Sequence, residues 1–132
     1  MNFVSVFGNP TGRHPRDAFI GGLAVLLLAV AFYLFLAQPG RNRDWVLIAL
    51  LFPGFVLHAR RLHDMGKTAW LLLVPGAPVI AFAWLHLFVP TSDLTQPMGW
   101  IAAALAAAFA VWGVVGKGQA EANRFGAVAA AA

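Results

Sequence analysis

Residues 18–37 read AFIGGLAVLLLAVAFYLFLA, twenty consecutive positions without a charged side chain. A helix of about twenty apolar residues crosses the hydrocarbon core of a bilayer, which is about 30 Å thick. Arg13 and Arg16 precede this run, and residues 38–40 (QPG) follow it as a helix stop and turn. The run is longer than the apolar region of a secretory signal, and bulky Phe35 stands where a cleavage site needs a small residue. We therefore expect a first membrane-spanning helix at 18–37.

The composition of the whole chain is that of an integral membrane protein. Of its 132 residues, 61% are hydrophobic and 11% are charged, whereas a soluble domain is about 45–50% apolar and about a quarter charged. The same numbers exclude a disordered chain, because disordered chains are polar and charged. The chain has no cysteine, which excludes a disulfide framework, a thiolate nucleophile and a cysteine-based zinc site. The length fits a single domain, residues 1–132.

Three further apolar runs follow the first one. The second reaches a spanning length if it continues from residue 45 to residue 61, because arginine side chains can snorkel to the interface. Pro53 and Gly54 predict a kink in its middle, and residues 75–78 (PGAP) predict a break in the third run. We therefore predict an all-α fold, an integral membrane four-helix bundle, with spans at about 18–37, 45–61, 69–89 and 98–115.

The fourth run, 98–115, contains seven alanines, so most of the side chains on its surface are small. Small residues let helix backbones approach closely in lipid, so we expect this helix to be the packing centre. His86, in the third run, stands alone in the sequence and is expected to be an interfacial or packing residue.

The distribution of positive charge sets the orientation of the four spans. If both termini are inside, seven of the nine Lys and Arg residues lie in inner segments and only Arg41 and Arg43 lie in outer ones. Positive charge accumulates in cytoplasmic segments, so both the N- and the C-terminus are predicted to be cytoplasmic. The inner cations are Arg13, Arg16, Arg60, Arg61, Lys67, Lys117 and Arg124.

A polar segment, residues 58–67 (HARRLHDMGK), separates the second and third apolar runs. Asp64 lies four residues after Arg60 and three after Arg61, so on a helix it can pair with either arginine. Gly66 is expected to be a left-handed C-cap, and Thr68 the N-cap of the next span. One interpretation is a charged turn that fixes orientation and caps two helices. The other is that arginines converge on an anion such as a lipid headgroup phosphate.

Other functions leave weaker traces in the sequence. His58 and His63 are five residues apart, so they do not share a helix face, and the nearby arginines would repel a cation; no metal site is predicted. No nucleophile is identifiable, so no catalytic residue is assigned, although a His63–Asp64 acid–base pair in a membrane-embedded enzyme stays an alternative. A small transporter or channel subunit is another, because Pro/Gly-broken spans can expose polar backbone groups to a substrate.

Three motifs resemble one known family. Residues 60–70 (RRLHDMGKTAW) are similar to the Arg-Arg-Leu-His-Asp-x-Gly-(Arg/Lys)-(Ser/Thr)-x-Trp signature of the YhaH-like inner-membrane proteins, the family of domain of unknown function eight-zero-five. Gly12 and Arg13, followed by Arg16 and Phe19, resemble the start of its first span. Residues 123–126 (NRFG) resemble its Asn-(Arg/Lys)-Tyr-Gly motif, with a phenylalanine in place of the tyrosine.

The resemblance implies a small four-helix protein of the bacterial inner membrane, whose three motifs meet at the cytoplasmic face. It implies no reaction. We therefore expect a non-enzymatic protein that binds an anionic lipid headgroup or a membrane partner. Membrane lipids and a second copy or another membrane protein are the expected partners, with no cofactor and no nucleic acid. The candidate binding residues are Arg13, Arg16, Arg60, Arg61, His63, Asp64, Asn123 and Arg124.

Overall fold

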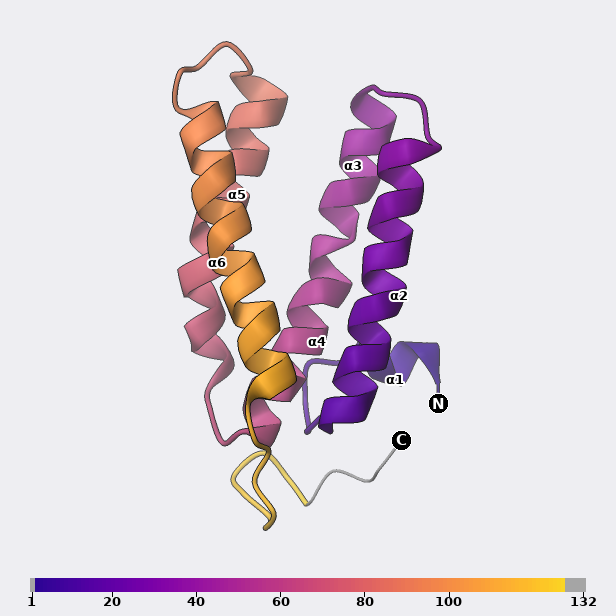
Figure 1. The fold of residues 1–132 in the computed structure, drawn as a ribbon, viewed down its shortest axis with the longest axis vertical. Helices are drawn as coiled ribbons and strands as arrows, with labels where there is room; N and C mark the ends of the chain where they lie inside the picture. The colour runs from indigo at the N-terminus through magenta and orange to yellow at the C-terminus, as the bar shows by residue number, and fades with distance from the viewer. Residues whose placement is uncertain (1, 128–132) are drawn as a thin grey trace.

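A computed structural model of the protein describes residues 2–127, in which helices are the main regular secondary structure (Figure 1). No strand forms within these residues, apart from one isolated bridge between Asn123 and Gly126. The all-α prediction is therefore confirmed. The helices are α1 (Phe3–Phe7), α2 (Arg16–Phe35), α3 (Arg41–Ala49), α4 (Leu51–Asp64), the 3₁₀ helix η1 (Ala69–Leu72), α5 (Leu73–Phe88) and α6 (Thr95–Val115).

Four stretches of the described chain are helical, long and apolar enough to cross a membrane. They are Arg16–Phe35, Arg41–Asp64, Ala69–Phe88 and Thr95–Val115. The second begins four residues before the expected residue 45, because the polar residues 41–44 form the first turn of α3. The fourth begins at Thr95, ahead of the expected residue 98, and takes Pro97 into its first turn, where a missing amide hydrogen costs no helical bond.

The helices form two hairpins, α2 with α3–α4 and α5 with α6. Figure 1 shows them close together at the end where α1 and the segment after α6 lie, and apart at the other end. We call the first the polar end, because it carries residues 12–16, 60–67 and 116–126. The second, the far end, is formed by the connections at residues 36–40 and 89–94. The three motifs of the family signature thus meet at one end, as the resemblance implied.

The second span is interrupted at Leu50, which separates α3 from α4. Pro53 has no amide hydrogen for the carbonyl of Ala49, which accounts for a break one turn before the proline. The third span behaves differently from the prediction of a break. Its 3₁₀ turn passes into α5 at Leu73, Pro75 falls in the first turn of α5, and Pro78 lies inside the helix.

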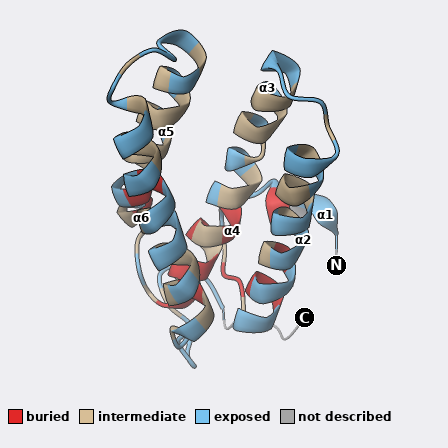
Figure 2. Ribbon diagram, turned by 45° about the horizontal axis from the view of Figure 1, so that its top comes forward, coloured by how far each residue is buried: buried red, intermediate tan, exposed pale blue. Residues whose placement is uncertain are grey.

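The buried core lies toward the polar end, as Figure 2 shows. One cluster joins Val6 and Phe7 of α1 to Phe19 of α2 and Leu57 of α4. A second joins Ala59 and Leu62 of α4 to Met65 in the turn after it and to Leu72 of η1.

The expected packing centre is wrong. α6 buries only Ala102 and Gly113, and most of its alanines are exposed. The central element is α4, which buries six residues, including two charged ones, because its apolar and polar faces both contact other parts of the chain. The buried residues of α4 are Val56, Leu57, Ala59, Arg61, Leu62 and Asp64.

Candidate functional site

Asp64, the last residue of α4, lies between two arginines. Its Oδ2 accepts a hydrogen bond of 2.6 Å from Nη1 of Arg61, one turn earlier in the same helix. Its Oδ1 accepts from Nε of Arg13 at 3.1 Å and lies 3.0 Å from Nη2 of Arg13. All three residues are buried. Buried charges are stable only when they are paired and hydrogen-bonded, and this triad meets both conditions.

Arg61 also caps the C-terminal end of α6. Its Nε donates to the carbonyl of Gly113 at 2.8 Å, and its Nη2 donates to the carbonyl of Gly116 at 2.6 Å. The last carbonyls of a helix have no partner within the helix and carry partial negative charge, so a guanidinium is well suited to them. Gly113 lies where α6 meets α2, because a Cβ there would collide with the ring of Phe19. Arg61 thereby joins the two hairpins.

Arg13 attaches the segment that follows α6, residues 117–126, which we call the C-terminal strap. The guanidinium of Arg13 donates to the carbonyl of Glu121 at 2.8 Å and to the carbonyl of Gln119. The amide of Gln119 in turn donates to the carbonyl of Asp64 at 2.7 Å. Gly118 passes so close to the Asp64 carboxylate that no Cβ would fit between them. The strap is therefore held mainly through main-chain groups.

The rest of the strap contacts the turn after α4. The side-chain amide of Asn123 donates to the carbonyl of His63 at 2.9 Å and to Oε1 of Gln119 at 2.7 Å. The ring of Phe125 stacks on His63, with centroids 4.0 Å apart and planes inclined by 9°, and the Arg124 guanidinium lies 4.7 Å from the Phe125 centroid. The phenyl ring lacks the hydroxyl of the tyrosine usual in the family motif, yet it makes this contact through its face.

The segment before α2 runs along α4. The amide of His14 donates to the carbonyl of Arg60 at 3.1 Å, and Nη2 of Arg60 donates to the carbonyl of Arg13 at 3.3 Å. Nδ1 of His63 lies 3.0 Å from the carbonyl of Gly12, whose φ of +83° favours glycine. Burial lowers the pKa of His14, and the charges of Arg60 and Arg61 lower it further.

Seven of the eight predicted site residues belong to this network. Arg13, Arg61 and Asp64 form its buried centre, and Arg60, His63, Asn123 and Arg124 surround them. Arg16 is exposed at the start of α2. The expected local geometry is also present, because Gly66 has a φ of +73° and the Thr68 hydroxyl accepts from the amide of Trp70 at 3.3 Å.

The main-chain acceptors of the network were not predicted. The carbonyls of Gly113, Gly116, Gln119 and Glu121 take up most of the arginine donors. A carbonyl is present at every residue, so no side-chain pattern marks it. The only sequence signal for these main-chain contacts is the pair of glycines at 116 and 118, because a residue without a side chain permits a close approach of the backbone.

A pocket of about 380 Å³ opens beside the triad. Three cations and one carboxylate are among the side chains that line it: Arg16, Arg61, Lys117 and Asp64. Arg16 and Lys117 are exposed, whereas Arg61 is 1% exposed and its three nitrogens all donate to protein groups. Chemically, the pocket offers two accessible cations above a carboxylate that is already neutralised.

The His63–Asp64 pair is not arranged as an acid–base dyad. The Asp64 oxygens accept from arginines, and Nδ1 of His63 is directed to the carbonyl of Gly12. Within residues 2–127, no group of three or more His, Asp or Glu side chains is placed to hold a metal ion. His86, expected to be an interfacial or packing residue, contacts the Asp44 carboxylate at 3.3 Å, which links α5 to α3 at the far end. It also stacks on Phe82 of its own helix.

Comparison with known proteins identifies a family and no activity. Neither a search of curated proteins nor a search of solved structures finds a match. A family model described as "Protein of unknown function (DUF805)" matches residues 7–127, a range that contains all three motifs and the whole buried triad. The chain therefore belongs to this family of unknown function.

Proposed function

We propose that the protein crosses the bacterial inner membrane four times, with both termini in the cytoplasm, and binds the phosphate of an anionic lipid headgroup in the pocket at its polar end. The binding is non-enzymatic. The observation that carries the proposal is the position of two exposed cations, Arg16 and Lys117, on a pocket beside the ends of three candidate spans.

The position of the pocket supports a headgroup as the ligand. Its lining comes from the start of α2, the end of α4 and the residues just after α6. In a protein whose apolar helices cross a bilayer, these ends lie at the depth of the headgroups. The excess of positive charge at this end favours the cytoplasmic side, where anionic lipids attract basic residues.

The contacts of the arginines assign two different roles to the predicted site residues. Arg13 and Arg61 donate to Asp64 and to main-chain carbonyls, so they position the walls of the pocket. Arg60, His63 and Asn123 hold the N-terminal segment and the strap against α4, whereas Arg124 contacts the neighbouring ring of Phe125 within the strap. Arg16 and Lys117 are the groups that contact the ligand phosphate, because they line the pocket and are exposed.

Native mass spectrometry of the detergent-purified protein tests this proposal. Phosphatidylglycerol is expected to be retained more strongly than phosphatidylcholine, and Arg16→Gln with Lys117→Gln should weaken its retention roughly thirtyfold, because each cation near a headgroup contributes about 1 kcal/mol. The matched control is Lys67→Gln with Arg124→Gln, which removes two exposed cations that do not line the pocket.

Equal losses in the two double variants would mean that overall charge, and not this pocket, retains the lipid. Unchanged retention in the Arg16/Lys117 variant would reject the site. Reporter fusions at each terminus test the orientation, and opposite locations of the two reporters would contradict the four-span topology.

A further inference from the structure

A second pocket, of about 540 Å³, lies at the far end, where residues 36–40 connect α2 to α3. Its volume falls in the range of small-ligand sites, about 300–1,000 Å³. Arg41 and Arg43 are among its lining residues, together with the neutral polar side chains of Tyr33, Gln38 and Asn42. No carboxylate is among the residues that line it. The pocket thus presents positive charge and neutral hydrogen-bonding groups.

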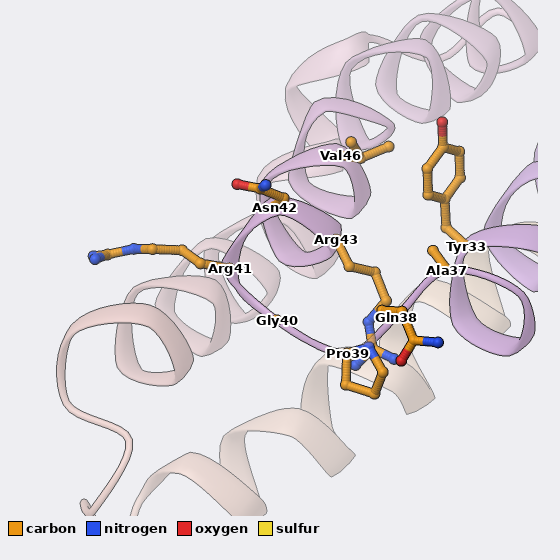
Figure 3. A pocket seen from close by; sticks show the side chains of 9 residues that line it. All are labelled: Tyr33, Ala37, Gln38, Pro39, Gly40, Arg41, Asn42, Arg43 and Val46. Atoms are coloured by element: carbon orange, nitrogen blue, oxygen red, sulfur yellow. The ribbon is translucent and has the colours of Figure 1, made fainter.

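The two arginines differ in direction, as Figure 3 shows. The Arg43 side chain folds back toward Gln38 and Pro39 of the connection, whereas the Arg41 side chain points away from the other lining residues. The Arg43 side chain is 22% exposed, so most of it is covered by the protein. Arg43 is therefore the cation that the fold directs to the pocket.

The Nε atom of Arg43 is buried and has no hydrogen-bond acceptor within the described part of the chain. The nearest carboxylate oxygen, Oδ1 of Asp44, is 3.9 Å away, which is too far for a hydrogen bond. The other oxygen of Asp44 contacts Nε2 of His86 at 3.3 Å. A buried donor without an acceptor is costly, so the missing partner points to a ligand that accepts hydrogen bonds.

We propose that this far-end pocket binds a phosphate-type oxyanion through Arg43. A planar guanidinium can donate two parallel hydrogen bonds to a phosphate, and the amide of Gln38 supplies a neutral donor beside it. This site is distinct from the one at the polar end, because a spanning helix of twenty residues is about 30 Å long and separates them. The oxyanion is either a free phosphate or the headgroup of a lipid.

The test uses the full chain in uncharged detergent, with Arg16→Gln and Lys117→Gln as the background, so that binding at the polar end is weakened. Two probes distinguish the sources: inorganic phosphate by isothermal titration calorimetry, and phosphatidylglycerol against phosphatidylcholine by native mass spectrometry. Binding of inorganic phosphate identifies a free-anion site. Retention of phosphatidylglycerol without phosphate binding identifies a lipid site.

The variants compare two arginines of one pocket. Arg43→Gln is expected to weaken binding of the active probe at least tenfold, and Arg41→Gln, which removes the same charge, less than threefold. Arg43→Lys keeps the charge but not the planar fork, so it should bind with intermediate strength, and it remains informative if Arg43→Gln does not fold. Three outcomes would each overturn the proposal. The first is an equal effect of Arg41→Gln and Arg43→Gln, the second is unchanged binding in both Arg43→Lys and Arg43→Gln, and the third is no binding of either probe.

Discussion

Asp64 holds two guanidinium groups, one from its own helix and one from a residue 51 positions earlier in the chain. Its main-chain carbonyl also accepts from the amide of Gln119. One residue therefore connects the segment before α2, the end of α4 and the strap after α6. The two arginines direct most of their donors to this centre and to nearby carbonyls, which makes the triad a structural element and leaves anion binding to the exposed cations.

Asp64→Asn is expected to destabilise the protein by about 3–5 kcal/mol. The substitution keeps the shape of the side chain but leaves two buried guanidinium groups without a counter-charge, and removal of one partner of a buried ion pair is strongly unfavourable. Thermal unfolding in detergent measures the effect. Asp93→Asn is the matched control, because Asp93 is exposed in the connection before α6. Equal stability of the two variants would contradict a central role for Asp64.

At the scale of elements, α4 combines an apolar and a polar side on fourteen residues. Val56 and Leu57 are buried within the hydrophobic part of the core, whereas Arg61 and Asp64 form the ion triad. The alanine-rich surface of α6 led to the prediction that this helix is the packing centre. Small side chains permit close packing, but they do not by themselves bury a helix face. A helix face becomes buried only when other segments pack on it. In this protein the segment before α2 and the C-terminal strap both pack on α4.

Pro53→Ala is expected to join α3 and α4 into one continuous helix. Alanine supplies the amide hydrogen that Pro53 lacks, and a proline inside a helix costs about 3 kcal/mol. Amide hydrogen exchange at residues 50–54 should slow by about tenfold, which corresponds to ~1.4 kcal/mol of local stability. Pro75→Ala is the control, because Pro75 lies in the first turn of α5, where the missing amide removes little. Unchanged exchange after Pro53→Ala would refute this explanation of the break.

At the scale of the whole molecule, two hairpins are fastened at the polar end and separate toward the far end (Figure 1). The fastening uses Arg61 on the carbonyls of α6 and Arg13 on the strap. At the far end the contact between His86 and Asp44 links the hairpins. The hydrogen bonds of Arg13 and Arg61 that fasten the bundle therefore lie where the proposed headgroup pocket is.

Truncation after Gly116, which removes the strap, is expected to destabilise the protein by about 2–5 kcal/mol and to speed tryptic cleavage after Arg13. Arg13 then loses its carbonyl acceptors at Gln119 and Glu121, and each unsatisfied buried donor costs about 1–3 kcal/mol. Glu121→Ala should leave both properties unchanged, because Arg13 contacts the main chain of Glu121 and not its carboxylate. A truncated protein as stable as the full chain would show that the strap is not part of the fastening.

The sequence alone determined the features that depend on local interactions. The length of the apolar runs predicts four helices long enough to span a membrane, and Gly66 and Thr68 mark the ends of two helices. The spacing of Arg60, Arg61 and Asp64 predicts that Asp64 pairs with one of the two arginines, and the structure selects Arg61. Each of these features depends on one continuous stretch of the chain, so composition, periodicity and spacing predict it.

Only the tertiary structure decided how these parts are joined. The pairing of Arg13 with Asp64 spans 51 residues, and the carbonyls that receive the arginines have no side-chain signature. Both pockets also depend on the fold. The pocket at the polar end forms where the ends of separate helices meet, and the far-end pocket forms between a connection and the two helices that it joins. Main-chain groups are the same at every position in a sequence, so only the folded path of the chain selects which of them meet a buried charge.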